Sequence, residues 1–91
     1  YWIAHVTVTD PDQYKHYAGD APIAFKKYGA VFLARGGASE QMEGNGRPRN
    51  VVVEFPSLQA ARDCYNSAEY QAARAKRLGA GEADIVIVEG V

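Results

Sequence analysis

The segment Asn50-Val51-Val52-Val53-Glu54-Phe55 has the strongest strand pattern in this chain of 91 residues. Three consecutive valines followed closely by a phenylalanine favour extended backbone, because β-branched and aromatic side chains pack well on a pleated surface. The apolar residues do not alternate strictly with polar ones, so we expect both faces of this strand to be at least partly covered. The rest of the chain must supply that cover.

Three other segments have strand character. Residues 2–9 are rich in aromatic and β-branched side chains, and their alternation places Trp2 and Val6 on one face and Ile3 and His5 on the other. A second strand is expected over residues 30–35, interrupted by a bulge or bend at the pair Gly36-Gly37 and resuming to about residue 43. Residues 84–89 predict the final strand, again apolar on both faces.

Two helical regions separate these strands. Residues 11–28 repeat apolar side chains every three or four positions, with Asp10 as the cap and Gly29 as the terminator. Pro22 lies inside this helix and predicts a kink between residues 19 and 22. Ser57 caps a second helix, which breaks near residue 66, and Ser67 caps its continuation toward residue 78.

The resulting order, β-α-β-β-α-β, predicts a single α+β domain over residues 1–91 with a ferredoxin-like, antiparallel four-stranded sheet. In that plan the helices cover one face of the sheet and leave the other open. The open face would still carry Ile3 and valines of the later strands. Such a patch is large for a monomer, so we expect a homodimer that packs sheet face against sheet face.

Composition excludes several classes of function. Ten basic and eleven acidic side chains give a formal net charge of −1, which argues against a general nucleic-acid binder. No apolar run approaches the roughly 20 residues that cross a bilayer, so we expect no membrane partner. A single cysteine, Cys64, cannot form an internal disulfide, and we expect no leader segment. These features predict a cytoplasmic protein.

The chain also resembles a bacterial family, the domain of unknown function 1330. The resemblance rests on the run Val53-Glu54-Phe55-Pro56-Ser57, on Tyr65-Asn66-Ser67 with Glu69-Tyr70-Gln71, and on residues 28–37. It implies the dimeric α/β-barrel superfamily, which includes small monooxygenases, dismutase-like haem enzymes, lactone isomerases and binding domains. One departure is Cys64, where the family often has tryptophan, and this smaller side chain could reshape the cavity beneath its helix.

The first candidate site combines His5, Glu54 and Arg35. If the first and third strands are antiparallel neighbours, a carboxylate at Glu54 could orient the His5 imidazole and raise its pKa, as a general base requires. Arg35 on a neighbouring strand could hold an anionic substrate through two hydrogen bonds. The alternative is a structural network in which arginine neutralises an inward glutamate at the dimer interface.

A second group, Tyr65 and Tyr70, lies near the break between the two C-terminal helical segments. Their hydroxyls could enter an apolar pocket, although tyrosines on helix stripes usually pack in the core. Arg77 belongs to the family-like run and joins them as a candidate substrate-binding residue. We expect His16 to face solvent and Cys64 to be a buried apolar group.

Two classes of function remain open. One is a small enzyme or ligand-binding protein that acts on a small organic metabolite, either apolar or carboxylate-bearing, with His5 and Glu54 as catalytic residues. The other is a dimeric structural or binding module without catalysis. We predict no cofactor and no metal, because the two histidines lie far apart in the sequence, and no haem, because no histidine stands where a haem ligand is expected.

Overall fold

The four strands form one antiparallel sheet in the order β2-β3-β1-β4 in a computed structural model that describes residues 1–91. The elements in chain order are β1 (Trp2–Val8), α1 (Pro11–Lys27), β2 (Val31–Arg35), β3 (Arg49–Glu54), α2 (Leu58–Tyr65), α3 (Ala68–Arg77) and β4 (Gly81–Ile87). This arrangement confirms the predicted α+β, ferredoxin-like fold. The second helical region is divided at the predicted point, between α2 and α3.

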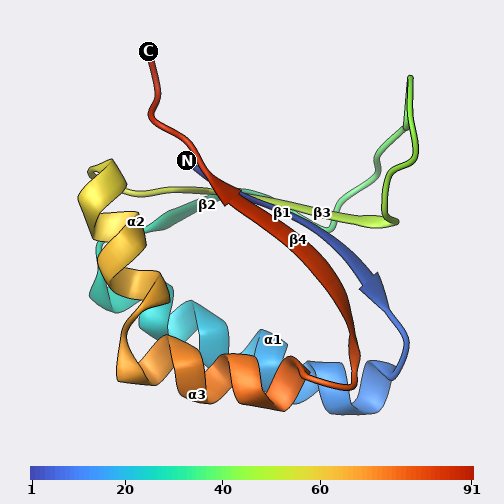
Figure 1. Cartoon of the computed structure of the whole chain (residues 1–91), viewed down its shortest axis with the longest axis horizontal. Coiled ribbons are helices and arrows are strands. Elements are labelled where there is room, and N and C mark those ends of the chain that lie inside the picture. Colours follow the sequence, from blue (N-terminus) through green and yellow to red (C-terminus); the bar gives the residue numbers. More distant parts are fainter.

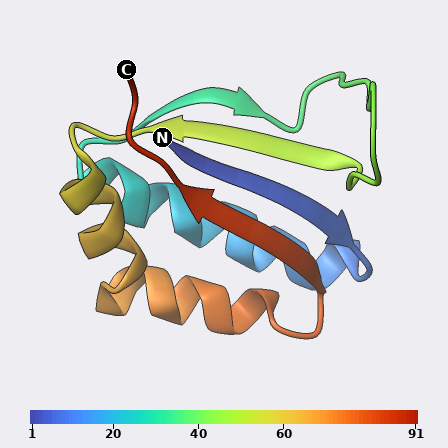
Figure 2. The same ribbon diagram turned by 45° about the horizontal axis from the view of Figure 1, so that its top comes forward.

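All three helices lie on the same side of the sheet (Figures 1 and 2). The side chains between the two layers form the core, and Trp2 is at its centre with 1% of its surface exposed. The Trp2 ring lies 5.0 Å from the Phe25 ring and 5.0 Å from the Tyr70 ring, between ring centroids and with edge-to-face geometry at both. Side chains of β1, α1 and α3 therefore meet in one aromatic cluster.

Side-chain caps start each helix. Asp10, Ser57 and Ser67 each accept a hydrogen bond from the backbone N–H three residues later. Helix α1 is continuous through Pro22, the residue at which the sequence predicted a kink. None of the three helices is both long enough and apolar enough to cross a bilayer.

The second strand differs from its prediction. It ends at Arg35 and does not resume, because Gly36 takes the left-handed conformation (φ 69°) and the chain continues as a loop to residue 48. The irregularity in its pairing lies between Phe32 and Ala34 and not at the glycine pair. The last strand begins earlier than predicted, at Gly81, and ends at Ile87.

The face of the sheet opposite the helices carries an apolar row that crosses all four strands in register. Ala34 pairs with Val52, Val52 with Ile3, and Ile3 with Val86. Val86 exposes 53% of its surface and Val31, at the edge of this face, 56%. We call this side the open face.

Candidate functional site

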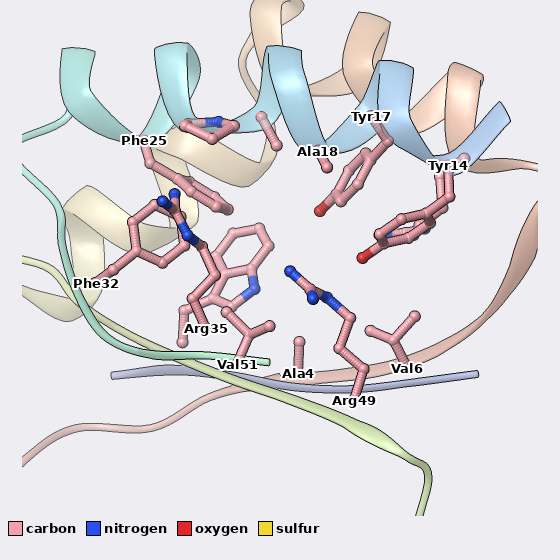
Figure 3. Close-up of a pocket in the computed structure, with 14 residues that line it drawn as sticks. Ala4, Val6, Tyr14, Tyr17, Ala18, Phe25, Phe32, Arg35, Arg49 and Val51 are labelled. Carbon is pink, nitrogen blue, oxygen red and sulfur yellow. The ribbon is translucent and has the colours of Figure 1, made fainter. Parts of the chain in front are cut away.

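A cavity of about 270 Å³ lies between α1 and the sheet (Figure 3). Its walls are mostly apolar and aromatic, and its charged groups are all arginines. The lining residues are Trp2, Ala4, Val6, Tyr14, Tyr17, Ala18, Ala21, Pro22, Phe25, Phe32, Arg35, Arg49, Val51 and Arg77. No aspartate or glutamate is among them. Cavities of this kind, apolar with a few convergent polar groups, are typical of small-molecule sites.

The strands place two of the arginines in the cavity. Arg35 pairs with Val51 across β2 and β3, and Arg49 lies two residues before Val51, so all three side chains are on the helix-covered face. The Arg35 guanidinium lies over the Phe32 ring, 4.4 Å from its centroid. Both guanidinium groups point from the sheet toward α1 (Figure 3).

Arg49 depends on a glycine for its position. A Cβ atom on Gly36 would overlap the Arg49 guanidinium and would push this side chain aside. The Nε atom of Arg49 is buried and has no hydrogen-bond partner, and the guanidinium lies 5.7 Å from the centroid of the Tyr14 ring. A buried donor of this kind is costly unless something pairs with it.

Arg77 reaches the same cavity from α3. Only 7% of its surface is exposed, and its guanidinium lies 5.0 Å from the centroid of the Tyr17 ring. Its Nη1 donates a hydrogen bond to the Tyr70 hydroxyl at 3.1 Å, and the Tyr70 and Tyr17 hydroxyls are 2.9 Å apart. Burial and the neighbouring Tyr70 raise the pKa of Tyr17 far above its usual value, and burial also raises the pKa of Tyr70. Both phenols therefore stay protonated at neutral pH.

The arginines of the cavity have no carboxylate partner. The ion pairs of the structure join Lys15 to Asp12, Lys27 to Glu69, Lys76 to Asp20, and Arg47 to Glu82 and Asp84. None of them includes Arg35, Arg49 or Arg77. The cavity therefore concentrates positive charge in an apolar setting, which favours an anion.

His5 and Glu54 do not come together as the sequence analysis expected. The first and third strands are indeed antiparallel neighbours, but His5 pairs with Asn50, and its Nδ1 is 2.6 Å from the Asn50 side-chain oxygen. Glu54 lies four residues farther along β3, about 13 Å away at the usual strand rise, and pairs with Val31. Glu54 therefore cannot orient His5 within this chain.

The register also separates Arg35 from His5, because His5 is on the open face and Arg35 on the helix-covered face. His5 instead lines a small polar hollow together with Gln41, Asn45, Gly46, Arg47 and Asp84. His16 is exposed and Cys64 fully buried, as predicted. Burial raises the pKa of the Cys64 thiol to about 12, so this thiol is a poor nucleophile.

Tyr65 and Tyr70 are neighbours, with ring centroids 5.4 Å apart, but they have different surroundings. Tyr70 is completely buried. It does not line the cavity, but its hydroxyl is hydrogen-bonded to that of Tyr17, which does. Tyr65 is half-buried and lines a second, more open hollow of about 390 Å³ beside β4. The other residues of that hollow are Arg62, Asn66, Arg74, Arg77, Ala83, Ile85 and Ile87.

Sequence reasoning found Arg35 and Arg77 but missed Arg49, Tyr14 and Tyr17 as cavity residues. A signal for Arg49 was present in the sequence. The alternation that buries Val51 and Val53 places residue 49 on the same face, so this arginine had to point toward the helices. For Tyr17 the sequence holds no such signal. The spacing of apolar residues on α1 places Tyr17 toward the sheet, but it does not distinguish a cavity residue from an ordinary core residue.

Comparison with known proteins places the chain in a family. The model of the domain of unknown function DUF1330 matches residues 1–91. The chain belongs to the DUF1330 family. This DUF1330 chain matches no curated protein.

Two solved structures, both of the protein RPA0582 from Rhodopseudomonas palustris, resemble this DUF1330 domain. One is described as a protein of unknown function and has 17% identity and a TM-score of 0.70. The match covers 99% of this chain and 80% of the chain of that structure. The other, of the methylated protein, has 16% identity and a TM-score of 0.71, with 99% and 78% covered. At this identity the likeness supports the fold alone.

Proposed function

We propose that the protein binds a small organic carboxylate in the cavity between α1 and the sheet. One observation carries this proposal: three arginines converge on an apolar cavity, and no ion pair neutralises any of them. Arginine is well suited to the role, because its planar guanidinium matches the two oxygens of a carboxylate.

The burial of Arg77 and of the Arg49 Nε atom supports an anionic ligand, whereas Arg35 is exposed. A charged group that leaves water without a partner of opposite charge destabilises the fold. Arg77 is 7% exposed and its side chain donates only to neutral tyrosine hydroxyls, while the Arg49 Nε has no partner. A bound carboxylate would supply the missing negative charge, so part of the electrostatic cost of folding would be recovered on binding.

The apolar walls define the remainder of the ligand. Phe25 and Phe32 contact each other edge to face, with centroids 5.5 Å apart, and line one side of the cavity. A cavity of about 270 Å³ suits a metabolite with a short hydrocarbon or aromatic body. Inorganic anions would leave these walls uncovered and are expected to bind weakly.

The alternative of a purely structural module predicts that the arginines satisfy acidic side chains. Arg47 does so, donating to both Asp84 and Glu82 at 2.9 and 3.0 Å. The three cavity arginines do not, and this difference favours the ligand-binding function.

Arg47 and Arg49 offer a matched test, because they are two residues apart in the chain and differ only in their surroundings. Isothermal titration calorimetry would measure binding of isocaproate, benzoate and phenylpropionate to the native protein, Arg49→Met and Arg47→Met. We expect Arg49→Met to lose about 1.5–3 kcal/mol of binding energy, the usual value for a charge-assisted hydrogen bond. Arg47→Met should bind as the native protein does.

The proposal is wrong if no carboxylate of this set binds, or if the two variants bind equally well. Thermal unfolding of each variant separates a loss of binding from a loss of fold. Because Met fills much of the volume of the Arg49 side chain and removes an unpaired charge, we expect Arg49→Met to be folded.

We further propose that a second copy of the chain covers the open face. The support is the apolar row Ala34-Val52-Ile3-Val86, in which Ala34 and Val86 are exposed and Val52 and Ile3 half-buried, on a sheet that has helices on one side only. Apolar surface of this kind is usually buried in an isologous dimer.

Sedimentation velocity tests the dimer with two variants that each add one charge. Val52→Glu places a carboxylate in the middle of the apolar row and should give a monomer. Ile23→Glu, at a residue of α1 that is 68% exposed, should leave a dimer. A native protein that sediments as a monomer at all concentrations would overturn this proposal.

A further inference from the structure

The hydroxyl groups of Tyr70 and Tyr17 are joined by a hydrogen bond that either of them could donate, and we infer its direction from the surroundings of Tyr70. Arg77 can only donate, so the Tyr70 oxygen accepts its hydrogen bond at 3.1 Å. Tyr70 is 0% exposed, and the only acceptor for its own hydrogen is the Tyr17 oxygen at 2.9 Å. If Tyr17 donated instead, the Tyr70 hydrogen would be buried without a partner, which is costly. Tyr70 therefore donates to Tyr17.

This direction leaves the Tyr17 hydrogen without a protein acceptor. Tyr17 lines the cavity and its hydroxyl points into the space between α1 and the sheet, whereas Tyr70 does not line the cavity (Figure 3). Polarisation by the Arg77 charge through Tyr70 strengthens Tyr17 as a donor. Because its raised pKa keeps this phenol protonated, the donor is present at any physiological pH.

The cavity therefore offers almost only donors. Arg35, Arg49 and Arg77 cannot accept a hydrogen bond, and Tyr17 already accepts from Tyr70, so the Tyr14 hydroxyl is the main side-chain acceptor left in the lining. A complementary ligand must therefore have two hydrogen-bond acceptor groups. One is a carboxylate that accepts from the guanidinium groups, and the other is an oxygen that accepts from Tyr17. An ammonium group is disfavoured, since no carboxylate in the cavity offsets its repulsion by the arginines.

We propose that the ligand is an oxo-carboxylate, and that Tyr17 determines this specificity by donating a hydrogen bond to the carbonyl oxygen. This inference rests on the proposed carboxylate site and adds a second anchor to it. A carbonyl oxygen only accepts, so it complements a cavity whose polar groups donate. A site built around such a bond discriminates well against an analogue that lacks the oxygen, because the buried donor is then left unpaired.

Three compounds with one carbon skeleton test the inference: α-ketoisocaproate, isocaproate and leucine. Isothermal titration calorimetry on the native protein should show α-ketoisocaproate binding about tenfold more tightly than isocaproate, as expected for one hydrogen bond of about 1.4 kcal/mol. Leucine should bind more weakly than either.

Three variants assign the preference to a residue. Tyr17→Phe should bind isocaproate as the native protein does and bind α-ketoisocaproate no better. Tyr70→Phe keeps the Tyr17 hydroxyl but removes the group that orients it, so the preference should shrink. Tyr14→Phe, which removes the other hydroxyl of the cavity wall, is the matched control and should keep the full preference.

The outcomes separate this inference from the proposed function. If neither α-ketoisocaproate nor isocaproate binds, the carboxylate site itself is wrong for this class. If both bind the native protein equally, or if Tyr14→Phe rather than Tyr17→Phe removes the preference, the role of Tyr17 is wrong while the carboxylate site stands. Binding of isocaproate to Tyr17→Phe also shows that this variant is folded.

Discussion

Arginines on the two faces of the sheet differ in whether they have a carboxylate partner. On the open face Arg47 contacts Thr7, Glu82 and Asp84 and remains near solvent. On the helix-covered face, two residues farther along the chain, Arg49 has a buried Nε without a partner, and Arg77 is buried beside neutral tyrosines. An arginine with its own carboxylates forms ion pairs within the fold, whereas a buried arginine without one carries an uncompensated charge, and there we propose that an anion binds.

The faces differ in their apolar residues as well. Trp2 and Val53 are buried under the helices with at most 1% of their surface exposed, while Ile3 and Val52, their neighbours in the chain, face the other way. The strand period of two is the reason, because it sends successive side chains to opposite faces. Changes in neighbouring residues can therefore test each face separately.

The largest effect should come from the aromatic core. We expect Trp2→Ala to lower the free energy of unfolding by about 3–5 kcal/mol, because it leaves a large cavity among Phe25, Phe55 and Tyr70. Ile3→Ala, one residue away, should cost much less in dilute protein. Urea unfolding of both variants checks this, and equal losses would contradict the distinction between the faces.

The next effect concerns a buried charge. Arg77→Met should lower the affinity for a carboxylate by about 1.5–3 kcal/mol, yet leave the thermal midpoint of the unliganded protein unchanged or higher. The reason is that Arg77 is buried without a counter-ion and Tyr70 keeps its acceptor in Tyr17. A large fall in the midpoint without ligand would show that Arg77 is mainly structural.

A smaller effect is expected at Gly36. Gly36→Ala places a Cβ in the left-handed region, which costs about 1–2 kcal/mol, and pushes the Arg49 guanidinium aside. Carboxylate affinity should therefore fall together with stability. Gly44 has a similar positive φ but lies in the loop away from Arg49, so Gly44→Ala should lower stability and leave binding unchanged.

The smallest effect should appear at alkaline pH. Burial raises the pKa of Cys64 from 9.0 to about 12, so the folded state holds this proton more tightly than the unfolded state does. The stabilising contribution is fully present below pH 9 and is lost as pH rises toward 12, by up to about 1.4 kcal/mol per pH unit. Urea unfolding between pH 8 and 10 should show this decrease in the free energy of unfolding. In Cys64→Ala the decrease should be smaller, because only the buried tyrosines then make the free energy depend on pH in this range.

Much of the fold was predictable from local patterns. The valine-rich third strand, the alternation in the first strand and the caps at Asp10, Ser57 and Ser67 predicted the elements and their order. The end of the second strand was not predictable in this way, because Gly36 permits either a bulge or a turn and only the surroundings choose. Here Gly36 takes the left-handed conformation directly after the last paired residue, Arg35.

The candidate site was predictable only in part. Arg35 and Arg77 were identified as substrate-binding candidates, but the pairing of His5 with Glu54 was wrong, since it required a strand register that sequence patterns do not specify. Periodicity fixes which face a side chain occupies, and it does so for each strand separately. The alignment of one strand against another depends on how the helices and sheet pack.

By itself, the sequence determined the order of the elements, the residues that cap them and the face of each strand that becomes buried, because these depend on interactions between near neighbours in the chain. Only the tertiary structure decided that Arg35, Arg49 and Arg77 share a cavity without a carboxylate, and that the Tyr70 hydroxyl lies within hydrogen-bond distance of Tyr17. These contacts join residues up to 53 positions apart. Their geometry follows from the packing of α1 and α3 on the sheet, which no local pattern contains.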